Sequence, residues 1–327
     1  MQKIEDFNIK RNNLKLERTM EYACKSCNRN YTLVDNIYVC DNCKNEFQII
    51  KEIPRFIDDF NYSGNFGFQW KKYSETQLDS YCKITLSEDR IKEVLEQDVS
   101  ILKDKYVLEA GSGAGRFTEV FLKYEAKLYS FDYSEAVEAN QANNGKDFIL
   151  FQGSIYEIPL NREQFDYVFC LGVIQHTPDP ELSFKCLSDQ VKRGGTLCVD
   201  AYEKRGYSFL KWKYLLRPIT KRLPQSFLYS LVKGMVFIFL PLSQLFGKVF
   251  GRLGHELFPV ANFMNIPFKN YKERYTWSVL DTFDWYGPAY DNPQTLESVK
   301  RWFVEGGYKD IKVFRGSNGV IGRGVKS

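Results

Sequence analysis

The sequence predicts an α/β fold: a doubly wound, mostly parallel sheet of seven strands, preceded by a small cysteine-rich unit and interrupted by a helical insert. Short apolar runs alternate with helix-like segments between residues 105 and 202, and the alternation returns between residues 293 and 327. Alternation of this kind is typical of a parallel sheet covered by helices on both faces. A minimal domain would join the two parts directly, whereas about 90 residues intervene here.

Seven apolar runs provide the expected strands: 105–110, 127–132, 148–153, 165–172, 196–202, 308–316 and 319–327. Helix-like segments lie between them, at 116–124, 134–143, 181–191 and 295–307. In open sheets of this type, ligands bind at the carboxyl ends of the strands. The chain therefore divides into four expected parts: a ribbon at 1–60, a linker or lid at 61–104, a core at 105–202 and 293–327, and an insert at 203–292.

A glycine-rich turn, VLEAGSGAGRF, follows the first strand of the core. Gly111, Gly113 and Gly115 have the spacing G-x-G-x-G, so the third glycine of the dinucleotide fingerprint is missing, and no P-loop lysine follows. Glu109 would repel a pyrophosphate but would suit an ammonium or sulfonium group. Asp132, at the tip of the second strand, is placed to accept hydrogen bonds from both hydroxyls of a ribose. S-adenosylmethionine satisfies both demands, and a nicotinamide cofactor does not.

The order EAGSGAG, FD, FDYVFCLGVIQHTPDP and KRGGTLCV resembles the class I S-adenosylmethionine-dependent methyltransferases over residues 105–202 and 294–325. The resemblance implies that the methionine and ribose side of the cofactor is lined by Glu109, Gly111, Gly113 and Gly115, with Asp132 on the ribose and Leu171 near the methionine. Ser154 and Ile155 would lie against adenine. Ser154 stands where the family often has an acidic residue, and its hydroxyl can still accept a hydrogen bond.

Four cysteines, Cys24, Cys27, Cys40 and Cys43, read C-x2-C-x12-C-x2-C. Two knuckles joined by a hairpin would bring four thiolates together, as a structural Zn²⁺ requires. The alternative is two disulfides or chance. The first twenty residues have no apolar signal region, so we expect a cytoplasmic protein whose thiols stay reduced. The ribbon and the following NFGFQWKKYSETQLDS resemble a subset of bacterial methyltransferases with a fused zinc ribbon.

Two side chains are candidates for the chemical step. Methyl transfer needs an aligned acceptor and, for many acceptors, a base that removes its proton. His176 follows the fourth strand, and it either catalyses or packs against the cofactor. Asp284 lies in LDTFDWYGPAYDNPQT, which resembles a segment of methyltransferases in sugar and polysaccharide pathways; the alternative is a polar turn. Gln77, with Trp70 and Tyr73, belongs to a segment that either folds over the cofactor or only links the ribbon to the core.

The insert combines positive charge with a long apolar stretch. From residue 203 to residue 280 there are 13 Lys and Arg against 3 Asp and Glu, while the net charge of the whole chain is only +4. We do not expect a membrane span, because it would put the two halves of one sheet domain on opposite sides of the membrane. We expect a helical cap over the active site, and residues 205–252 are also compatible with peripheral contact at the inner membrane surface. The charge favours an anionic acceptor, such as a nucleotide sugar or a lipid-linked glycan.

Three functions remain open from the sequence. The leading one is a methyltransferase acting on a small molecule or glycan-type acceptor, with oxygen favoured as the reacting atom by base rate. The second is a ribosomal or transfer RNA methyltransferase in which the ribbon and the insert grip nucleic acid; no dedicated RNA-binding module supports it. The third is a non-catalytic scaffold, which would have no need to keep EAGSGAG and Asp132.

Overall fold

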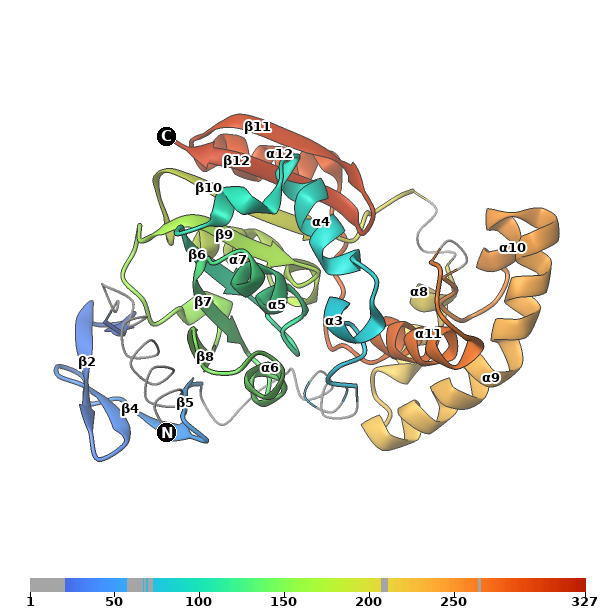
Figure 1. The fold of residues 1–327 in the computed structure, drawn as a ribbon, viewed down its shortest axis with the longest axis horizontal. Coiled ribbons are helices and arrows are strands. Elements are labelled where there is room, and N and C mark those ends of the chain that lie inside the picture. The colour runs from blue at the N-terminus through green and yellow to red at the C-terminus, as the bar shows by residue number, and fades with distance from the viewer. Residues whose placement is uncertain (1–20, 58–66, 68, 70–72, 207–210, 264–265) are drawn as a thin grey trace, which may run out of the picture.

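The computed structural model describes residues 21–57, 67, 69, 73–206, 211–263 and 266–327, excluding the side chains of residues 252 and 255. Trp70, expected in a lid, lies outside these residues. At the centre is a sheet with helices on both faces, flanked by the cysteine-rich ribbon on one side and the helical insert on the other (Figure 1). The insert thus lies at the end of the molecule away from the ribbon.

Seven strands form the core of the sheet, in the order β8-β7-β6-β9-β10-β12-β11. Their bounds are Tyr106–Ala110 for β6, Lys127–Asp132 for β7, Ile149–Gly153 for β8, Phe165–Leu171 for β9, Val191–Ala201 for β10, Tyr308–Gly316 for β11 and Gly319–Lys326 for β12. Strands β6 to β10 are parallel, and β12 runs antiparallel to both of its neighbours. The strand order reverses between β6 and β9, so this is the point where a doubly wound sheet binds its ligand.

The prediction of a seven-stranded sheet is wrong in extent, because the described residues form one mixed sheet of twelve strands. Strand β5 (Ile53–Phe56) pairs in parallel with β8 and continues into four antiparallel strands: β4 (Glu46–Ile50), β3 (Ile37–Cys40), β2 (Arg29–Val34) and β1 (Ala23–Cys24). The physical reason is that β8 would otherwise present an unpaired edge. Buried Arg55 reinforces the joint, donating to Gln152 at 2.8 Å and to Glu138 at 2.9 Å.

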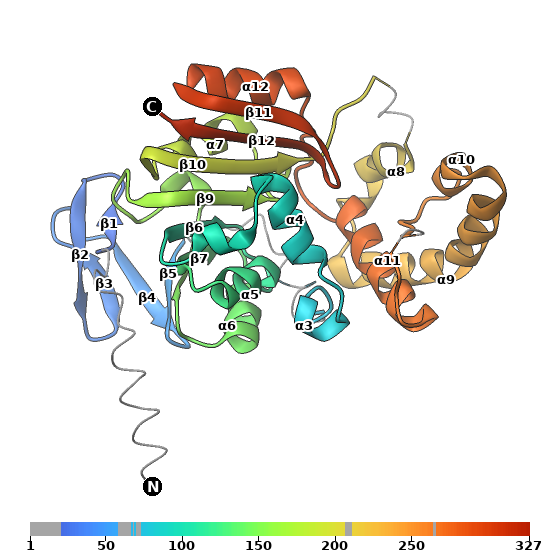
Figure 2. The same ribbon diagram turned by 45° about the horizontal axis from the view of Figure 1, so that its top comes forward.

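Helices cover both faces of the core sheet, as the doubly wound prediction requires (Figure 2). On one face, α7 (Pro180–Ser188) and α12 (Leu296–Glu305) contribute Phe184, Trp302 and Phe303 to the core. On the other face lie α4 (Leu86–Leu95), α5 (Arg116–Lys123) and α6 (Val137–Asn144). Short helices complete the layers: α3 (Asp79–Cys82), η1 (Val99–Leu102), η2 (Ile155–Glu157) and η3 (Ile174–His176).

The described residues of the insert form four helices: α8 (Trp212–Thr220), α9 (Gln225–Phe250), α10 (Arg252–Glu256) and α11 (Tyr271–Tyr286). Its two ends meet, because Lys204 and Gln294 exchange backbone hydrogen bonds with the opposite segment. Helix α9 packs against α11 through an apolar cluster that includes Val232, Val236 and Phe283. By length and composition α9 is the one described helix that could cross a membrane, and 33% of its most apolar window is buried inside the molecule.

Candidate active site

A cavity of about 290 Å³ lies at the carboxyl ends of β6 to β9. Its floor is the glycine turn and the strand tips, one wall is the segment before α4, and the opposite wall is α11 of the insert. The lining residues used below are Gln77, Arg90, Gly111, Gly113, Arg116, Asp132, Tyr133, Gly153, Ile155, Leu171, Gly172, Val173, His176, Tyr202, Trp277, Leu280, Asp281 and Asp284. The cavity therefore joins the expected cofactor site to residues of the insert.

The glycine turn is shaped by Asp132. One carboxylate oxygen of Asp132 accepts the N–H of Gly113 at 2.8 Å, and the other accepts the N–H and hydroxyl of Ser134. Gly111 has φ +78°, and a Cβ there would lie 2.4 Å from the Val173 side chain. A larger residue would therefore fill the space between the turn and Val173. Gly115 lies outside the lining, since its Cα faces Asn140 and Asn144.

Glu109 lies behind the cavity wall rather than in it. Its carboxylate accepts hydrogen bonds from Thr118 at 2.5 Å and Ser130 at 2.8 Å, and its second oxygen has no hydrogen-bond partner among the described residues. Burial raises the pKa of Glu109 to about 7. The side chain ties β6 to α5 and β7, and its predicted approach to a cationic group stays a prediction.

At the end expected for adenine, Ile155 and Gly153 line the cavity and Ser154 does not. The Ser154 hydroxyl instead accepts the N–H of Tyr156 and caps η2. Tyr133, directly after Asp132, also lines the cavity. Sequence reasoning missed Tyr133, although its place after the acidic strand tip was a usable signal. Leu171, predicted near the methionine, lies in the lining as well.

Two arginines in the cavity wall were also missed. Arg116 donates to Gln77 and Ser87, both at 3.2 Å, and its guanidinium lies over the Phe117 ring. Burial, and then the neighbouring Arg90, lower the pKa of Arg116 to about 10, so it remains a cation at neutral pH. A partly buried cation beside the glycine turn suits a carboxylate ligand. The predicted cofactor residue Gln77 lines the cavity and holds Arg116 in place.

At the other end of the cavity, His176 at the end of η3 and Tyr202 directly after β10 meet Asp281 and Asp284 of α11. The Asp284 carboxylate accepts the Tyr202 hydroxyl at 2.8 Å and lies 3.7 Å from His176 Nε2. His176 Nδ1 lies 3.1 Å from the carbonyl oxygen of Tyr290. Because a carbonyl only accepts, Nδ1 must donate, which makes Nε2 the unprotonated nitrogen of the neutral ring. Burial lowers the pKa of His176 and favours this neutral form.

Asp281 lies one turn before Asp284 on the same side of α11. Burial and the neighbouring Asp284 raise the pKa of Asp281 to about 7, from 3.8 in an unperturbed chain. Between these values the folded protein holds a proton that the unfolded chain has released, so stability falls as pH rises. We expect Asp281→Asn to flatten the fall in the thermal unfolding midpoint between about pH 4 and about pH 7.

The matched control for Asp281→Asn is Asp310→Asn, at an exposed position remote from the cavity. It should keep the wild-type dependence of the unfolding midpoint on pH. Equal slopes in wild type and Asp281→Asn would contradict the prediction. The pKa of Glu109 is also raised, so Glu109 makes the unfolding midpoint fall with rising pH in wild type and in Asp281→Asn alike.

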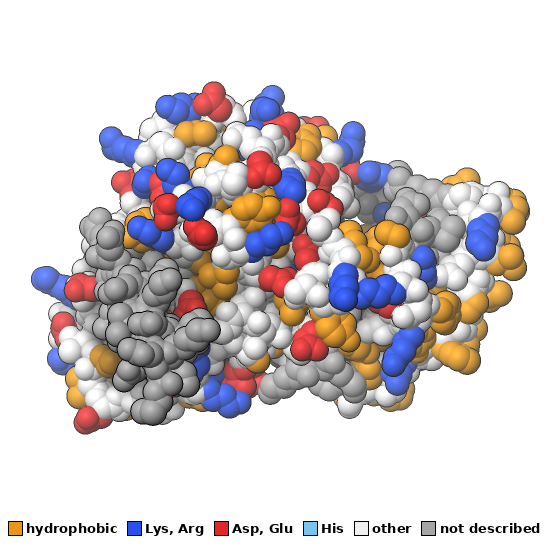
Figure 3. All heavy atoms as spheres, viewed as in Figure 1, with side chains coloured by type: hydrophobic (Ala, Val, Ile, Leu, Met, Phe, Trp, Pro, Cys, Tyr) orange, Lys and Arg blue, Asp and Glu red, His pale blue; other side chains and the backbone are white. Residues whose placement is uncertain are grey.

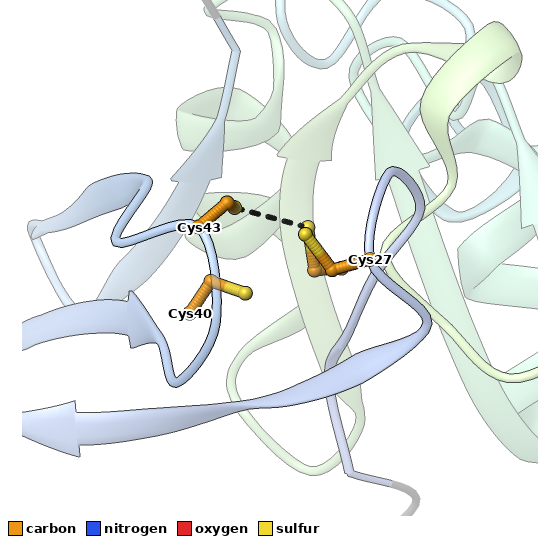
Figure 4. Close-up of side chains that lie close together, drawn as sticks. Cys27, Cys40 and Cys43 are labelled. Atoms are coloured by element: carbon orange, nitrogen blue, oxygen red, sulfur yellow. Dashed lines mark hydrogen bonds between the residues drawn. The ribbon is translucent and has the colours of Figure 1, made fainter.

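The four cysteines of the ribbon converge on one point. Each offers a sulfur, and the four sulfurs lie within 4.8 Å of one another. Cys27 comes from the first knuckle and Cys40 and Cys43 from the second, and their side chains point toward each other (Figure 4). All four are unpaired thiols, so the disulfide alternative does not describe this structure. Four sulfur donors this close together fit a metal ion that prefers thiolate ligands.

The central part of the chain matches a family of known proteins. The family model described as "Methyltransferase domain" matches residues 108–199, which include the glycine turn, Asp132 and His176. The resemblance to methyltransferases is thereby confirmed over residues 108–199, and S-adenosylmethionine is the cofactor of the methyltransferase fold. The match leaves the ribbon and the insert outside the methyltransferase domain.

Two curated relatives are similar over the methyltransferase domain. Ubiquinone biosynthesis O-methyltransferase of Coxiella burnetii is 30% identical over 120 residues, which cover 36% of this chain and 51% of that protein. The tRNA U34 carboxymethyltransferase of Ruthia magnifica is 31% identical over 142 residues, covering 40% of this chain and 43% of that protein. The chain thus spans about half the length of the curated relatives it matches.

Among solved structures, a SAM-dependent methyltransferase from Aquifex aeolicus aligns over 82% of this chain and 98% of its own, with 14% identity and a TM-score of 0.41. The similarity to a methyltransferase domain is carried by the sequence match over residues 108–199 and by the strand order of the core sheet.

Proposed function

We propose that the protein is an S-adenosylmethionine-dependent methyltransferase that transfers a methyl group to a hydroxyl of a small-molecule or glycan-type acceptor. The observation that carries the proposal is the single cavity that runs from the glycine turn and Asp132 to His176 and Asp284. Its first half has the features of a cofactor site, and its second half has those of a site for proton removal.

The residues of the first half fit the cofactor. Asp132 would hold the ribose, Ile155 and Tyr133 would enclose the adenine, and Arg116 would hold the methionine carboxylate. The space between Gly111 and Val173 is open only because Gly111 has no Cβ. When bound, S-adenosylmethionine supplies a methyl group whose bonding electrons stay on sulfur while an acceptor lone pair forms the new bond.

The residues of the second half fit a base and its support. The acceptor's hydroxyl proton passes to His176 Nε2, which the Tyr290 carbonyl leaves unprotonated through its contact with Nδ1. The Asp284 carboxylate, 3.7 Å away, stabilises the imidazolium that results. Tyr202 orients Asp284 through its hydroxyl. For this proton transfer, the acceptor oxygen must lie between His176 and the half of the cavity that would hold the cofactor.

The acceptor end of the cavity favours a neutral reacting group. The Asp284 carboxylate would repel an anion there, whereas Asp281 keeps its proton up to about pH 7, and Trp277 and Leu280 add apolar surface. A hydroxyl on a ring with an apolar face suits this lining. The positive charge of the insert led us to expect an anionic acceptor; on the present geometry any phosphate would lie away from the reacting atom. Oxygen as the reacting atom is also consistent with the ubiquinone O-methyltransferase relative.

RNA is the alternative acceptor, and the similarity to a tRNA-modifying enzyme is the observation that favours it. The Asp284 carboxylate at the acceptor end argues against a polyanion at that place. The test is the salt dependence of activity, using tritium-labelled cofactor with RNA and with hydroxylated small molecules. Binding of RNA should weaken steeply with salt. A small neutral acceptor should show little change.

For the ribbon, we propose one structural Zn²⁺ held by Cys24, Cys27, Cys40 and Cys43. Four cysteines leave no open position for a substrate or water, so the metal would stabilise the ribbon rather than catalyse. The cluster of four converging sulfurs supports the proposal. The ribbon's own core is small, and the ion would supply much of its folding energy.

The catalytic assignment predicts that His176→Ala lowers kcat by about 100-fold or more, the usual contribution of a general base. Binding of S-adenosylhomocysteine should change by less than about twofold, because the charge and hydrogen bonds of the cofactor half are untouched. Asp284→Asn should lower kcat less, since it only supports His176. Asp310→Asn is the exposed control. Equal losses of kcat and cofactor affinity in His176→Ala would instead indicate a role in packing against the cofactor.

A further inference from the structure

The outer surface of the insert is unusually apolar. The described residues have twenty-two exposed large hydrophobic side chains, and fourteen of them lie between residues 212 and 257. They are Trp212, Leu215, Ile219, Phe227, Leu231, Phe237, Ile238, Leu242, Leu245, Phe246, Val249, Phe250, Leu253 and Leu257. Scattered single residues of this kind are normal on a soluble protein, whereas a contiguous group indicates a binding surface. Figure 3 shows orange side chains gathered over α9 and α10 at this end of the molecule.

Helix α9 has two apolar faces. Leu228, Val232, Val236 and Leu240 are buried against α11 and its neighbours. Exposed apolar residues recur on the opposite side at intervals of four, seven, four, three and four residues: Phe227, Leu231, Ile238, Leu242, Leu245 and Val249. This spacing puts them on one stripe of the helix. Nothing among the described residues covers the stripe, which we call the outer stripe.

Charge indicates what covers the outer stripe. Residues 204–255 contain ten Lys and Arg and no Asp or Glu. Three of these cations are used inside the insert, since Arg205 pairs with Glu203, Lys213 pairs with Asp291 and Arg217 donates to backbone carbonyls. Lys221, Arg222, Lys233 and Lys248 are exposed beside the apolar residues. Apolar side chains bordered by cations match the interface of a bilayer that contains anionic lipids.

A second copy of the chain fits the surface less well. Two such faces packed together would bring their lysines and arginines close to one another, with no carboxylate from the same segment to neutralise them. The orientation of α9 also favours a bilayer surface over a span. Its buried residues run from Leu228 to Gly247, so α11 and the rest of the insert hold the helix along most of its length.

We propose that helices α8, α9 and α10 dock the protein on the surface of an anionic lipid bilayer, with the outer stripe in the interface and the exposed cations against the headgroups. Helix α11 then separates the membrane from the cavity, contacting α9 on one side and lining the acceptor end on the other. The docking does not depend on the proposed function. Delivery of a membrane-held acceptor to the cavity would rest on it.

The test is cosedimentation of the full-length, zinc-loaded protein with vesicles of phosphatidylcholine alone and of phosphatidylcholine mixed with phosphatidylglycerol. We expect binding to the mixed vesicles that weakens as salt is raised, and weaker binding to the neutral ones. The double variant Ile238→Asp, Leu245→Asp should lower partitioning to the mixed vesicles by about tenfold or more, because it puts two carboxylates into the interface. Lys233→Gln with Lys248→Gln should reduce only the part that depends on salt.

The matched control is Val304→Asp on α12, because Val304 is 57% exposed while Ile238 and Leu245 are each 58% exposed. It should bind vesicles like the wild type. All variants should keep the wild-type unfolding midpoint and affinity for S-adenosylhomocysteine, which excludes misfolding as the cause. Wild type that stays in the supernatant with both vesicles overturns the proposal. A dimer detected by light scattering in the wild type and lost in the Ile238→Asp, Leu245→Asp variant would also overturn the proposal. The surface would then be an interface between two copies of the chain.

The two proposals fail separately. Cofactor binding without vesicle binding refutes the docking surface and leaves the enzyme intact. Vesicle binding without cofactor binding refutes the proposed function and leaves the docking surface intact.

Discussion

Replacing Asp132 by Ala is expected to weaken binding of S-adenosylhomocysteine by about 100-fold or more, since hydrogen bonds to a charged group are worth about 1.5–3 kcal/mol each. The carboxylate would hold the ribose, and it also fixes the glycine turn through the N–H of Gly113 and anchors Ser134. Its loss removes a cofactor contact and the order of the turn together. Isothermal titration calorimetry with S-adenosylmethionine and S-adenosylhomocysteine measures the effect.

Two further variants make the Asp132 experiment specific. Asp132→Asn keeps the size of the side chain and one acceptor oxygen, so it should bind more weakly than wild type but better than Asp132→Ala. Asp147→Ala removes an exposed carboxylate just before β8 and should bind like wild type. Wild-type affinity in Asp132→Ala would remove Asp132 from the cofactor site. No binding by the zinc-loaded wild type would instead favour the non-catalytic scaffold.

Replacing Cys43 by Ser is expected to release the metal and loosen the ribbon. Cys43 is exposed, so the change removes almost no packing and its effect reports on the metal. Structural zinc in small peptides contributes about 10–16 kcal/mol of folding free energy at neutral pH. We therefore expect loss of bound zinc by elemental analysis and a lower unfolding midpoint. The near-ultraviolet circular dichroism should also change, because Tyr22, Tyr31, Tyr38 and Phe47 surround Phe56 in the ribbon.

The control for the ribbon is Cys186→Ser, which alters a cysteine outside the cluster. It should retain the metal. A chelator should reproduce the effect of Cys43→Ser on wild type and have no further effect on that variant. Full zinc content in Cys43→Ser would show that Cys43 is not a ligand.

The parallel core was predictable because its strands are long apolar runs that alternate with helices. The pairing of β5 with β8 was not predictable. Strand β5 is only Ile53–Phe56, it contains a proline and a charged arginine, and the two strands are separated by more than ninety residues. Short strands of this composition carry a weak periodic signal. Their pairing is decided by the exposed edge of β8, which appears only once the sheet is built.

At the site, the sequence located the residues that sit on regular motifs and missed those that depend on packing. Gly111, Asp132, Leu171, His176 and Asp284 do line one cavity. Glu109 and Ser154 are placed by the same motif, yet local hydrogen bonds direct their side chains to Thr118 and Tyr156 instead. Arg90, Arg116 and Asp281 enter the wall from separate elements. Their convergence depends on how α4, α5 and α11 pack, which spacing along the chain does not reveal.

Helix α11 both lines the acceptor end of the cavity and packs within the insert, and the residues for these two roles alternate along the helix. Trp277, Leu280, Asp281 and Asp284 line the cavity, whereas Val279, Phe283 and Tyr286 pack within the insert. Trp277 also packs on Phe263 and Phe268 of the insert, whereas Asp281 and Asp284 are not part of its apolar packing. Selection, or a library randomised at Asp281 and Asp284, can therefore explore new acceptors with little change to the packing that holds the helix.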